Sequence, residues 1–234
     1  MMAWLGRRIT TPALLFVAMV VCFAVVLGCA IAIGGLLELA ERPDGSTAID
    51  SSITSWVVTH RTHALTSVAR LLSTLGSQAV LIPLIAIAAV ALLGRRRWVL
   101  AGLVVAAWGG AIGMYSLTKH FVHRMRPPMD IWLTDVGRTS SFPSGHATQS
   151  LATFLALVLV GAVIIPGARW PGRVIALALA IGVGWSRVYL GVHWATDVGA
   201  GWVIAAGWLT IVVWLARAAG SIQWRPRGDR QLET

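Results

Sequence analysis

The sequence predicts an all-α protein that crosses a membrane several times. Of its 234 residues, 57% are apolar and 12% are charged, whereas a soluble domain carries about 25% charged residues. The mean hydropathy of +0.76 agrees with this. One membrane-spanning helix needs about 20 residues, so six would use about half the chain and leave no room for a large soluble domain. We therefore expect a single integral-membrane domain over residues 1–234.

Six apolar segments are candidates for these spans. They cover approximately residues 11–39, 79–93, 98–117, 146–165, 174–189 and 193–215. The first follows Arg7 and Arg8 and continues past Cys29. That is longer than the 7–15 apolar residues of a signal peptide, so a first transmembrane helix is predicted instead.

The long polar stretch at residues 41–78 lies between the first two spans. Its apolar residues recur at helical spacing in two groups: Ile49, Ile53, Trp56 and Val57, then Leu65, Val68, Leu72 and Leu75. This pattern is typical of short amphipathic helices on a membrane surface. His60 and His63 in this stretch are interpreted as exposed interfacial residues rather than metal ligands.

The formal charge of +10 is explained by membrane topology. Lys and Arg collect in short cytoplasmic loops of membrane proteins. With the N-terminus inside, most basic residues fall in inside segments, and the outside segments are close to neutral. The inside set is Arg7, Arg8, Arg95, Arg96, Arg97, Arg169, Arg173, Arg217, Arg225, Arg227 and Arg230. We expect a multi-pass cell-membrane protein with both termini cytoplasmic, and a nucleic-acid partner is not needed to explain the charge.

Because successive spans cross the membrane in opposite directions, this topology also brings ionisable residues together at the outer face. They occupy the ends of spans three to six: Lys119, Arg126, His146, Arg187, His193 and Asp197. Ionisable groups at membrane depth are costly and are functional candidates for that reason. Three cations suit a multiply charged anion, and the planar guanidinium of arginine matches phosphate oxygens.

A helix start and two histidines complete the predicted phosphate site. Ser144 is expected to cap the fourth span, and Gly145 would let backbone N–H groups approach an anion there. His193 and Asp197 are spaced i, i+4 and are expected on one helical face. The carboxylate would hold one imidazole nitrogen and leave the other to attack phosphorus or act as a base. His146 is the expected general acid for the leaving oxygen.

No metal or other cofactor is expected. Histidines occur at His120 and His123 as well as at the site, but three cations would repel Zn²⁺ and the outside loops hold few acids for Mg²⁺. His120 and His123 are therefore interpreted as loop or interfacial residues.

Three motifs carry a family resemblance. Residues 119–127 match K-x6-R-P, residues 143–146 match P-S-G-H, and residues 186–197 match S-R-x5-H-x3-D. Each motif alone is weak, but together and in this order they are specific. They resemble the signature of the type 2 phosphatidic acid phosphatase superfamily, which includes lipid phosphate and polyprenyl diphosphate phosphatases, glucose-6-phosphatase and soluble vanadium haloperoxidases.

The resemblance implies a metal-independent phosphatase that hydrolyses the terminal phosphate of a lipid phosphate or polyprenyl diphosphate. It makes His193 the nucleophile that forms a phosphohistidine, with Asp197 orienting it. It makes His146 the acid for the leaving group and then the base for water. The implied phosphate-binding residues are Lys119, Arg126, Ser144, Gly145 and Arg187. The chemistry alone would also permit His193 to act as a base.

Other functions remain open at this point. A phosphotransferase would use the same site and differ only in its acceptor. An anion transporter would spread its charges through the depth of several spans, whereas here they gather at span ends. A haloperoxidase is disfavoured because six spans place the site at a membrane. The sequence indicates neither the lipid tail nor the oligomeric state.

Overall fold

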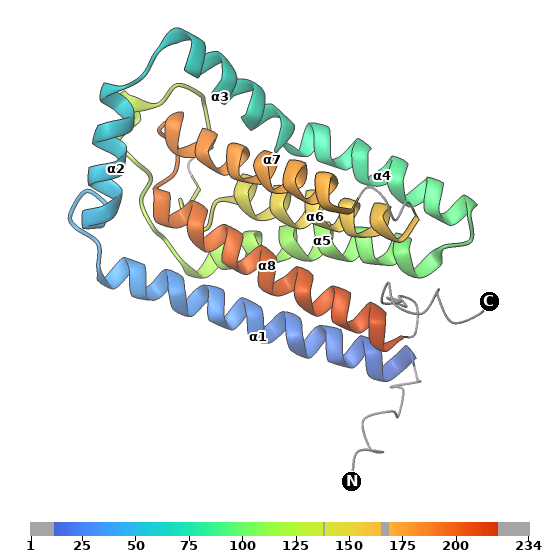
Figure 1. The fold of residues 1–234 in the computed structure, drawn as a ribbon. Helices are drawn as coiled ribbons and strands as arrows, with labels where there is room; N and C mark the ends of the chain where they lie inside the picture. The colour runs from blue at the N-terminus through green and yellow to red at the C-terminus, as the bar shows by residue number, and fades with distance from the viewer. Residues whose placement is uncertain (1–11, 138, 165–168, 220–234) are drawn as a thin grey trace, which may run out of the picture.

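A computed structural model describes residues 12–137, 139–164 and 169–219, and these are helical with no strand (Figure 1). The α-helices are α1 (Pro12–Leu39), α2 (Ala48–Thr59), α3 (His63–Leu75), α4 (Gln78–Gly94), α5 (Trp98–Phe121), α6 (Gly145–Ile164), α7 (Arg169–Tyr189) and α8 (Ala195–Ala218). A short 3-10 turn, Met129–Ile131, lies in the α5–α6 connection. The predicted all-α class is confirmed.

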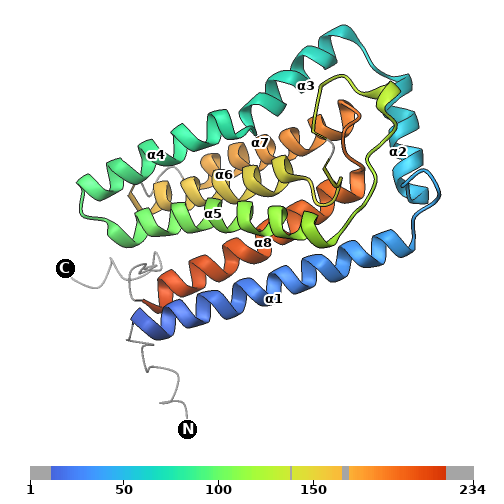
Figure 2. The same ribbon diagram turned by 180° about the vertical axis from the view of Figure 1, so that it is seen from behind.

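Helix α6 occupies the centre of the bundle. It contacts α5, α7 and α8, while α1 packs on α8 and α5 from outside. Figures 1 and 2 show α2 crossing one end of the bundle, beside the α5–α6 connection and the α7–α8 turn. That end therefore collects three segments that are distant in sequence.

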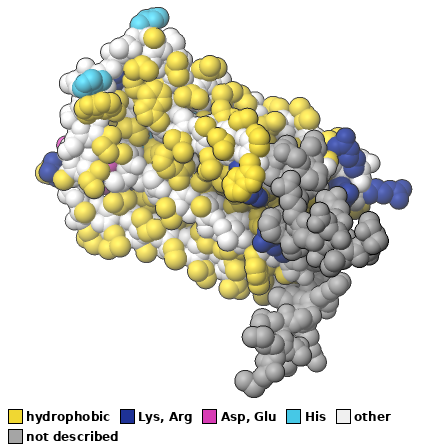
Figure 3. Space-filling model, in the orientation of Figure 1, with side chains coloured by type: hydrophobic (Ala, Val, Ile, Leu, Met, Phe, Trp, Pro, Cys, Tyr) yellow, Lys and Arg dark blue, Asp and Glu magenta, His cyan; other side chains and the backbone are white. Residues whose placement is uncertain are grey.

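Among the described residues, four helices are long and apolar enough to span a membrane: α1, α5, α6 and α8. Helices α3 and α4 pass the same test together, as a fifth span broken by a 43° bend. Many apolar side chains remain exposed (Figure 3), as expected for a surface that faces lipid. A multi-pass membrane protein is thus supported. The predicted total of six spans, and the surface location of the helices in residues 41–78, stay predictions.

Two helix starts differ from those predicted. Helix α7 begins at Arg169 rather than near Val174, and α8 begins at Ala195 rather than at His193. The second difference has a clear cause. The Asp197 carboxylate accepts a hydrogen bond from the backbone N–H of Trp194 at 2.9 Å, which makes Trp194 the N-cap. His193 therefore precedes the helix instead of belonging to its first turn.

The packing of α8 on α5 depends on a glycine and a tryptophan. A Cβ on Gly110 would lie 2.3 Å from the Trp208 ring, so only glycine admits this close approach. The Trp208 indole donates to the Ala106 carbonyl at 2.9 Å and meets Phe23 of α1 edge-on. These contacts join α1, α5 and α8 and fix the bundle around α6.

Basic residues mark the end of the bundle opposite to α2. Arg95, Arg96 and Arg97 form the α4–α5 turn, and Arg217 lies in the last turn of α8. Figure 3 shows Lys and Arg gathered mainly at this end, at the right of the view. Some arginines of the predicted inside set lie outside the described residues: Arg7, Arg8, Arg225, Arg227 and Arg230. Arg169 and Arg173 belong to α7, and the side chain of Arg169 is not described.

Candidate active site

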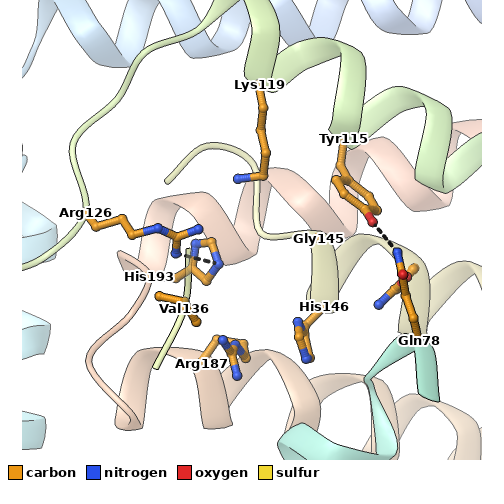
Figure 4. Close-up of a pocket in the computed structure, with 10 residues that line it drawn as sticks. Gln78, Tyr115, Lys119, Arg126, Val136, Gly145, His146, Arg187 and His193 are labelled. Atoms are coloured by element: carbon orange, nitrogen blue, oxygen red, sulfur yellow. Dashed lines mark hydrogen bonds between the residues drawn. The ribbon is translucent and has the colours of Figure 1, made fainter. Parts of the chain in front are cut away.

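A cavity of about 330 Å³ is lined in part by the α5–α6 connection and the α7–α8 turn, which lie beside α2. Six of the eight predicted site residues line it: Lys119, Arg126, Gly145, His146, Arg187 and His193. The other lining residues are Gln78, Tyr115, Val136 and Gln149 (Figure 4). Residues from α5, α6, α7 and two connections therefore converge as the sequence predicts. Ser144 and Asp197, the other two predicted residues, are buried beside the cavity.

A tight turn after α7 delivers His193 to this cavity. Gly191 has φ +75°, a left-handed conformation that favours glycine, and an added Cβ would lie 2.6 Å from the Ile131 carbonyl oxygen. The backbone N–H of Val192 then donates to the Arg187 carbonyl at 3.2 Å. The turn brings the S-R and H-x3-D parts of the third motif close together.

The His193 ring lies between a carboxylate and a guanidinium. Its Nδ1 is 3.5 Å from Asp197 Oδ2, and its Nε2 is 3.2 Å from Arg126 Nη1. The predicted pairing of His193 with Asp197 is therefore present, but the predicted shared helical face is wrong. His193 precedes the N-cap residue Trp194, whereas Asp197 lies in the first turn of α8 and also accepts a hydrogen bond from the Trp194 N–H.

The electrostatic surroundings keep His193 neutral. Burial lowers the pKa of His193 from 6.5 to about 3, with Arg126 and Lys119 adding to the effect and Asp197 opposing it. The side chain is only 4% exposed. Because Nδ1 faces a carboxylate, we assign the ring proton to Nδ1 and the lone pair to Nε2. An unprotonated Nε2 is what a nucleophile or a base requires.

The three predicted cations are held mainly by neutral oxygens. Lys119 Nζ donates to the Ser140 and Ser141 carbonyls, and Arg126 Nη1 donates to the Val192 carbonyl at 2.6 Å. Arg187 Nη1 donates to the Ser73 hydroxyl, and its buried Nε has no partner in the described ranges.

Within the described part of the chain, none of these three cations forms an ion pair with a carboxylate. Burial lowers the pKa of Arg126 from its ordinary value, although Asp197 opposes this. The cations therefore present uncompensated positive charge to the cavity, and a bound anion would relieve their mutual repulsion.

The start of α6 supplies the remaining predicted residues. The Ser144 carbonyl accepts from the Thr148 N–H at 3.0 Å, as an N-cap carbonyl does, but the buried Ser144 hydroxyl has no partner among the described residues. Ser144 is therefore the N-cap by position and not through its side chain. A Cβ on Gly145 would lie 3.1 Å from the Tyr115 ring, so glycine lets this ring approach the helix start. His146 follows and lines the cavity.

Arg124 is a buried residue of this region that the sequence analysis missed. Its guanidinium pairs with Asp197 Oδ1 at 2.6 Å, Asp50 Oδ2 at 2.7 Å and Glu41 Oε1 at 3.0 Å. Burial, the largest single influence, lowers the pKa of Arg124, but Asp197 and Asp50 outweigh it and the pKa is raised. Its only sequence signal is its place within K-x6-R-P, where it occupies an unspecified position.

The contacts of Arg124 fix Asp197 and anchor α2 to the site. Asp50 also accepts from the Thr196 N–H at 3.0 Å, so α2 is held against the start of α8. Asp197 Oδ2 accepts from the Ser141 hydroxyl as well as from Trp194. Asp197 is thus a fully buried carboxylate with a satisfied and rigid position, and Arg124 and Ser141 are positioning residues for it.

We expect Arg124→Lys to lower kcat about 10- to 100-fold with a smaller change in KM, because lysine cannot donate to three carboxylates in the same geometry. The control is Arg42→Lys, since Arg42 is exposed and its guanidinium donates a hydrogen bond to the Ser51 hydroxyl, away from Arg124 and Asp197. Steady-state kinetics with p-nitrophenyl phosphate and a thermal unfolding curve would be measured for both variants. A kcat within twofold of the unmodified protein in a stable Arg124→Lys variant would contradict the role.

The described residues contain no group of three or more His, Cys, Asp or Glu side chains arranged so that it could hold a metal ion. His60, His63, His120 and His123 are each exposed, as the sequence analysis expected. Independence from metal stays a prediction.

Comparison with known proteins identifies the family. Residues 97–221, more than half of the chain, match the model of the PAP2 superfamily. The chain belongs to the PAP2 superfamily. The resemblance inferred from the three motifs is thereby confirmed, and all three lie inside the matched segment.

Two relatives and one solved structure show which PAP2 proteins it is similar to. The chain is 33% identical over 176 residues to a decaprenylphosphoryl-5-phosphoribose phosphatase of Mycobacterium tuberculosis, covering 72% of this chain and 89% of that one. It is 30% identical over 119 residues to an undecaprenyl-diphosphatase of Sulfolobus acidocaldarius, covering 48% of this chain and only 53% of that one. The crystal structure of a PAP2 phosphatidylglycerolphosphate phosphatase from Bacillus subtilis superposes with a TM-score of 0.69 at 25% identity, over 86% of this chain and 98% of that one.

Proposed function

We propose that this PAP2 protein is a membrane phosphatase that hydrolyses the terminal phosphate of a lipid phosphate or polyprenyl diphosphate. The observation that carries the proposal is the cavity itself, in which two histidines and three cations without carboxylate partners converge beside a helix N-terminus. The PAP2 relatives named above act on lipid-linked phosphates or diphosphates, which fits a cavity within a bundle of apolar helices.

In the first step, the cations and the start of α6 bind the phosphoryl oxygens. Arg126 exchanges its contact with His193 Nε2 for a phosphate oxygen, which frees the lone pair of Nε2. Nε2 attacks phosphorus, the bond between phosphorus and the leaving oxygen breaks, and protonated His146 gives its proton to that oxygen. Asp197 stabilises the positive charge that builds on the His193 ring.

In the second step, water releases the phosphate. His146, now neutral, takes a proton from water as the oxygen attacks phosphorus. The bond between phosphorus and Nε2 breaks, the electron pair returns to His193, and inorganic phosphate leaves. Both histidines are then restored to their starting protonation states. Lys119, Arg126 and Arg187 stabilise the charge on the equatorial oxygens in both steps, a task that a metal ion performs in other phosphoryl-transfer enzymes.

We further propose that the cavity faces the outside of the cell membrane. The arginine-rich end of the bundle would then be cytoplasmic, as the distribution of Lys and Arg in membrane proteins requires. With α4 and α7 also spanning, the chain crosses six times and both termini are cytoplasmic. The charged residues of the cavity lie together at the α2 end of the bundle instead of being spread along it. This argues against an anion transporter, which needs a polar path through the whole depth of the membrane.

The proposal is tested by phosphate release from purified protein in detergent. We expect release from phosphatidic acid, phosphatidylglycerol phosphate or undecaprenyl diphosphate, and the rate should persist in excess EDTA because the cations perform the metal's electrostatic task. If no lipid phosphate or diphosphate is hydrolysed, the proposed function is wrong. Loss in EDTA with rescue by Mg²⁺ or Zn²⁺ would overturn the metal-independent mechanism.

We expect His146→Ala to lose activity unevenly across leaving groups. General acid catalysis contributes about 10²–10⁴-fold and matters most for a poor leaving group such as a lipid alcohol. The loss should therefore be smaller on p-nitrophenyl phosphate than on phosphatidic acid. Single-turnover release of the leaving group measures this without interference from phosphoenzyme breakdown. Equal losses on both substrates would show that His146 is not the acid.

A further inference from the structure

One side of the cavity is polar but uncharged, and the mechanism above does not use it. Gln78 of α4, Tyr115 of α5 and Gln149 of α6 line this side. Gln78 Nε2 donates to the Tyr115 hydroxyl oxygen at 2.8 Å, as the dashed line in Figure 4 shows. The Tyr115 O–H proton remains available to another acceptor. We refer to these three residues as the neutral side.

Gln149 carries an unsatisfied acceptor. Its side chain is 2% exposed, and its Nε2 donates to the Gly76 carbonyl at 2.9 Å. That bond fixes which end of the amide is nitrogen. The buried Oε1 has no hydrogen-bond partner in the described residues. A buried acceptor without a donor costs free energy, and Gln149 lines the cavity, so a ligand that donated a hydrogen bond to Oε1 would recover that free energy.

The neutral side lies where the leaving group must go. Gln149 follows His146 by one turn of α6 and shares its face, and the Tyr115 ring packs on Gly145. Figure 4 shows Tyr115, Gln78 and His146 away from Arg126 and His193. In phosphoryl transfer, nucleophile and leaving group lie roughly in line on opposite sides of phosphorus. With His193 as nucleophile, the leaving oxygen points toward His146 and the neutral side.

We propose, on the basis of the phosphatase function above, that Gln149 Oε1 accepts a hydrogen bond from a free hydroxyl of the leaving group. The preferred substrate is then a lipid phosphate whose terminal phosphate is carried by a polyol, either glycerol or a sugar, with a free hydroxyl one or two carbons away from the carbon that bears the phosphate. A diphosphate fits less well. Its leaving group is itself a phosphate, which brings negative charge and no hydroxyl hydrogen to side chains that cannot neutralise it.

The test compares substrates that differ by one hydroxyl. Phosphatidylglycerol phosphate is paired with its 1,3-propanediol analogue, which lacks the central hydroxyl of the headgroup. We expect the unmodified protein to favour the hydroxylated member about tenfold in kcat/KM. In Gln149→Leu this ratio should fall below about twofold.

Thr153→Val is the matched control. Thr153 lies one turn further along α6, is buried and also has an unpartnered hydroxyl, but it does not line the cavity. Its variant should keep the tenfold ratio. Equal ratios for Thr153→Val and Gln149→Leu would overturn the assignment to Gln149. If Gln149→Leu does not fold, the two substrates still test the proposal with the unmodified protein. A kcat/KM ratio near one for that protein overturns the proposal.

Two further substrates complete the test. A polyprenylphosphoryl ribose 5-phosphate distinguishes a sugar from glycerol, according to which of the two polyol substrates has the higher kcat/KM. Undecaprenyl diphosphate should be the poorer substrate, and a higher kcat/KM for it than for both polyol substrates would overturn the inference while leaving the phosphatase function intact. Only the failure of every substrate would count against the function itself.

Discussion

Replacing His193 by alanine is expected to abolish hydrolysis, with a loss of at least ~10⁴-fold on lipid and p-nitrophenyl substrates alike. Among the described residues that line the cavity, only His193 has its imidazole held between a carboxylate and a guanidinium. Without it no covalent intermediate forms, and a good leaving group does not help. Single-turnover assays of both substrates would measure the loss.

The control for this variant is another histidine near the site. His120 is exposed on α5, next to Lys119, and is outside the cavity. His120→Ala should keep activity within about twofold. If His193→Ala retained activity on p-nitrophenyl phosphate but lost it on a lipid phosphate, His193 would be the acid and the two histidines would have been assigned in reverse.

Asp197→Asn is expected to slow the chemical step by up to ~10⁴-fold, the loss seen for a comparable change in a serine protease triad. An amide does not stabilise the charge on the His193 ring as a carboxylate does. It also presents an N–H₂ group to donors that already surround the side chain, namely Arg124, Ser141 and the Trp194 N–H. Asp130→Asn, at an exposed position of the α5–α6 connection, is the control.

The pH dependence separates this role from a simple effect on protonation. Asp197 raises the pKa of His193, so removing its charge lowers that pKa further below about 3. His193 is then neutral at every pH above that value in both proteins. The titration of His193 should therefore add no pH dependence to the loss in Asp197→Asn between about pH 5 and 9. A loss that disappears at one end of this range would contradict a purely electrostatic role.

The sequence predicted most of the site because its chemistry is local to three motifs. Lys119, His146 and Arg187 lie at helix ends, where charged residues interrupt apolar segments and are easily recognised. The position of His193 was predicted less well. Its contact with Asp197 was expected on one face of a helix that begins at His193. Instead, the Asp197 carboxylate accepts a hydrogen bond from the Trp194 N–H, and the helix begins two residues after His193, at Ala195.

The residues that were missed depend on tertiary contacts. Asp50 of α2 and Glu41 of the α1–α2 connection are 74 and 83 residues from Arg124 in sequence. They meet it only because this part of the chain folds across the end of the bundle. Gln78 and Gln149 are uncharged, and neither occupies a specified position of the three motifs. Only the packing of α4, α5 and α6 shows that both line the cavity, so only the structure reveals the neutral side.

The most direct test of the mechanism is to trap the phosphoenzyme. His146→Ala is suited to this, because p-nitrophenolate leaves without an acid whereas water attack still lacks its base, so the intermediate should accumulate. The variant would be mixed with p-nitrophenyl phosphate, quenched in alkali and digested for mass spectrometry. The mechanism predicts an alkali-stable, acid-labile phosphoryl group on His193 that forms as fast as p-nitrophenolate is released. Phosphate on another residue, or a burst of p-nitrophenolate with no modified His193, would contradict it.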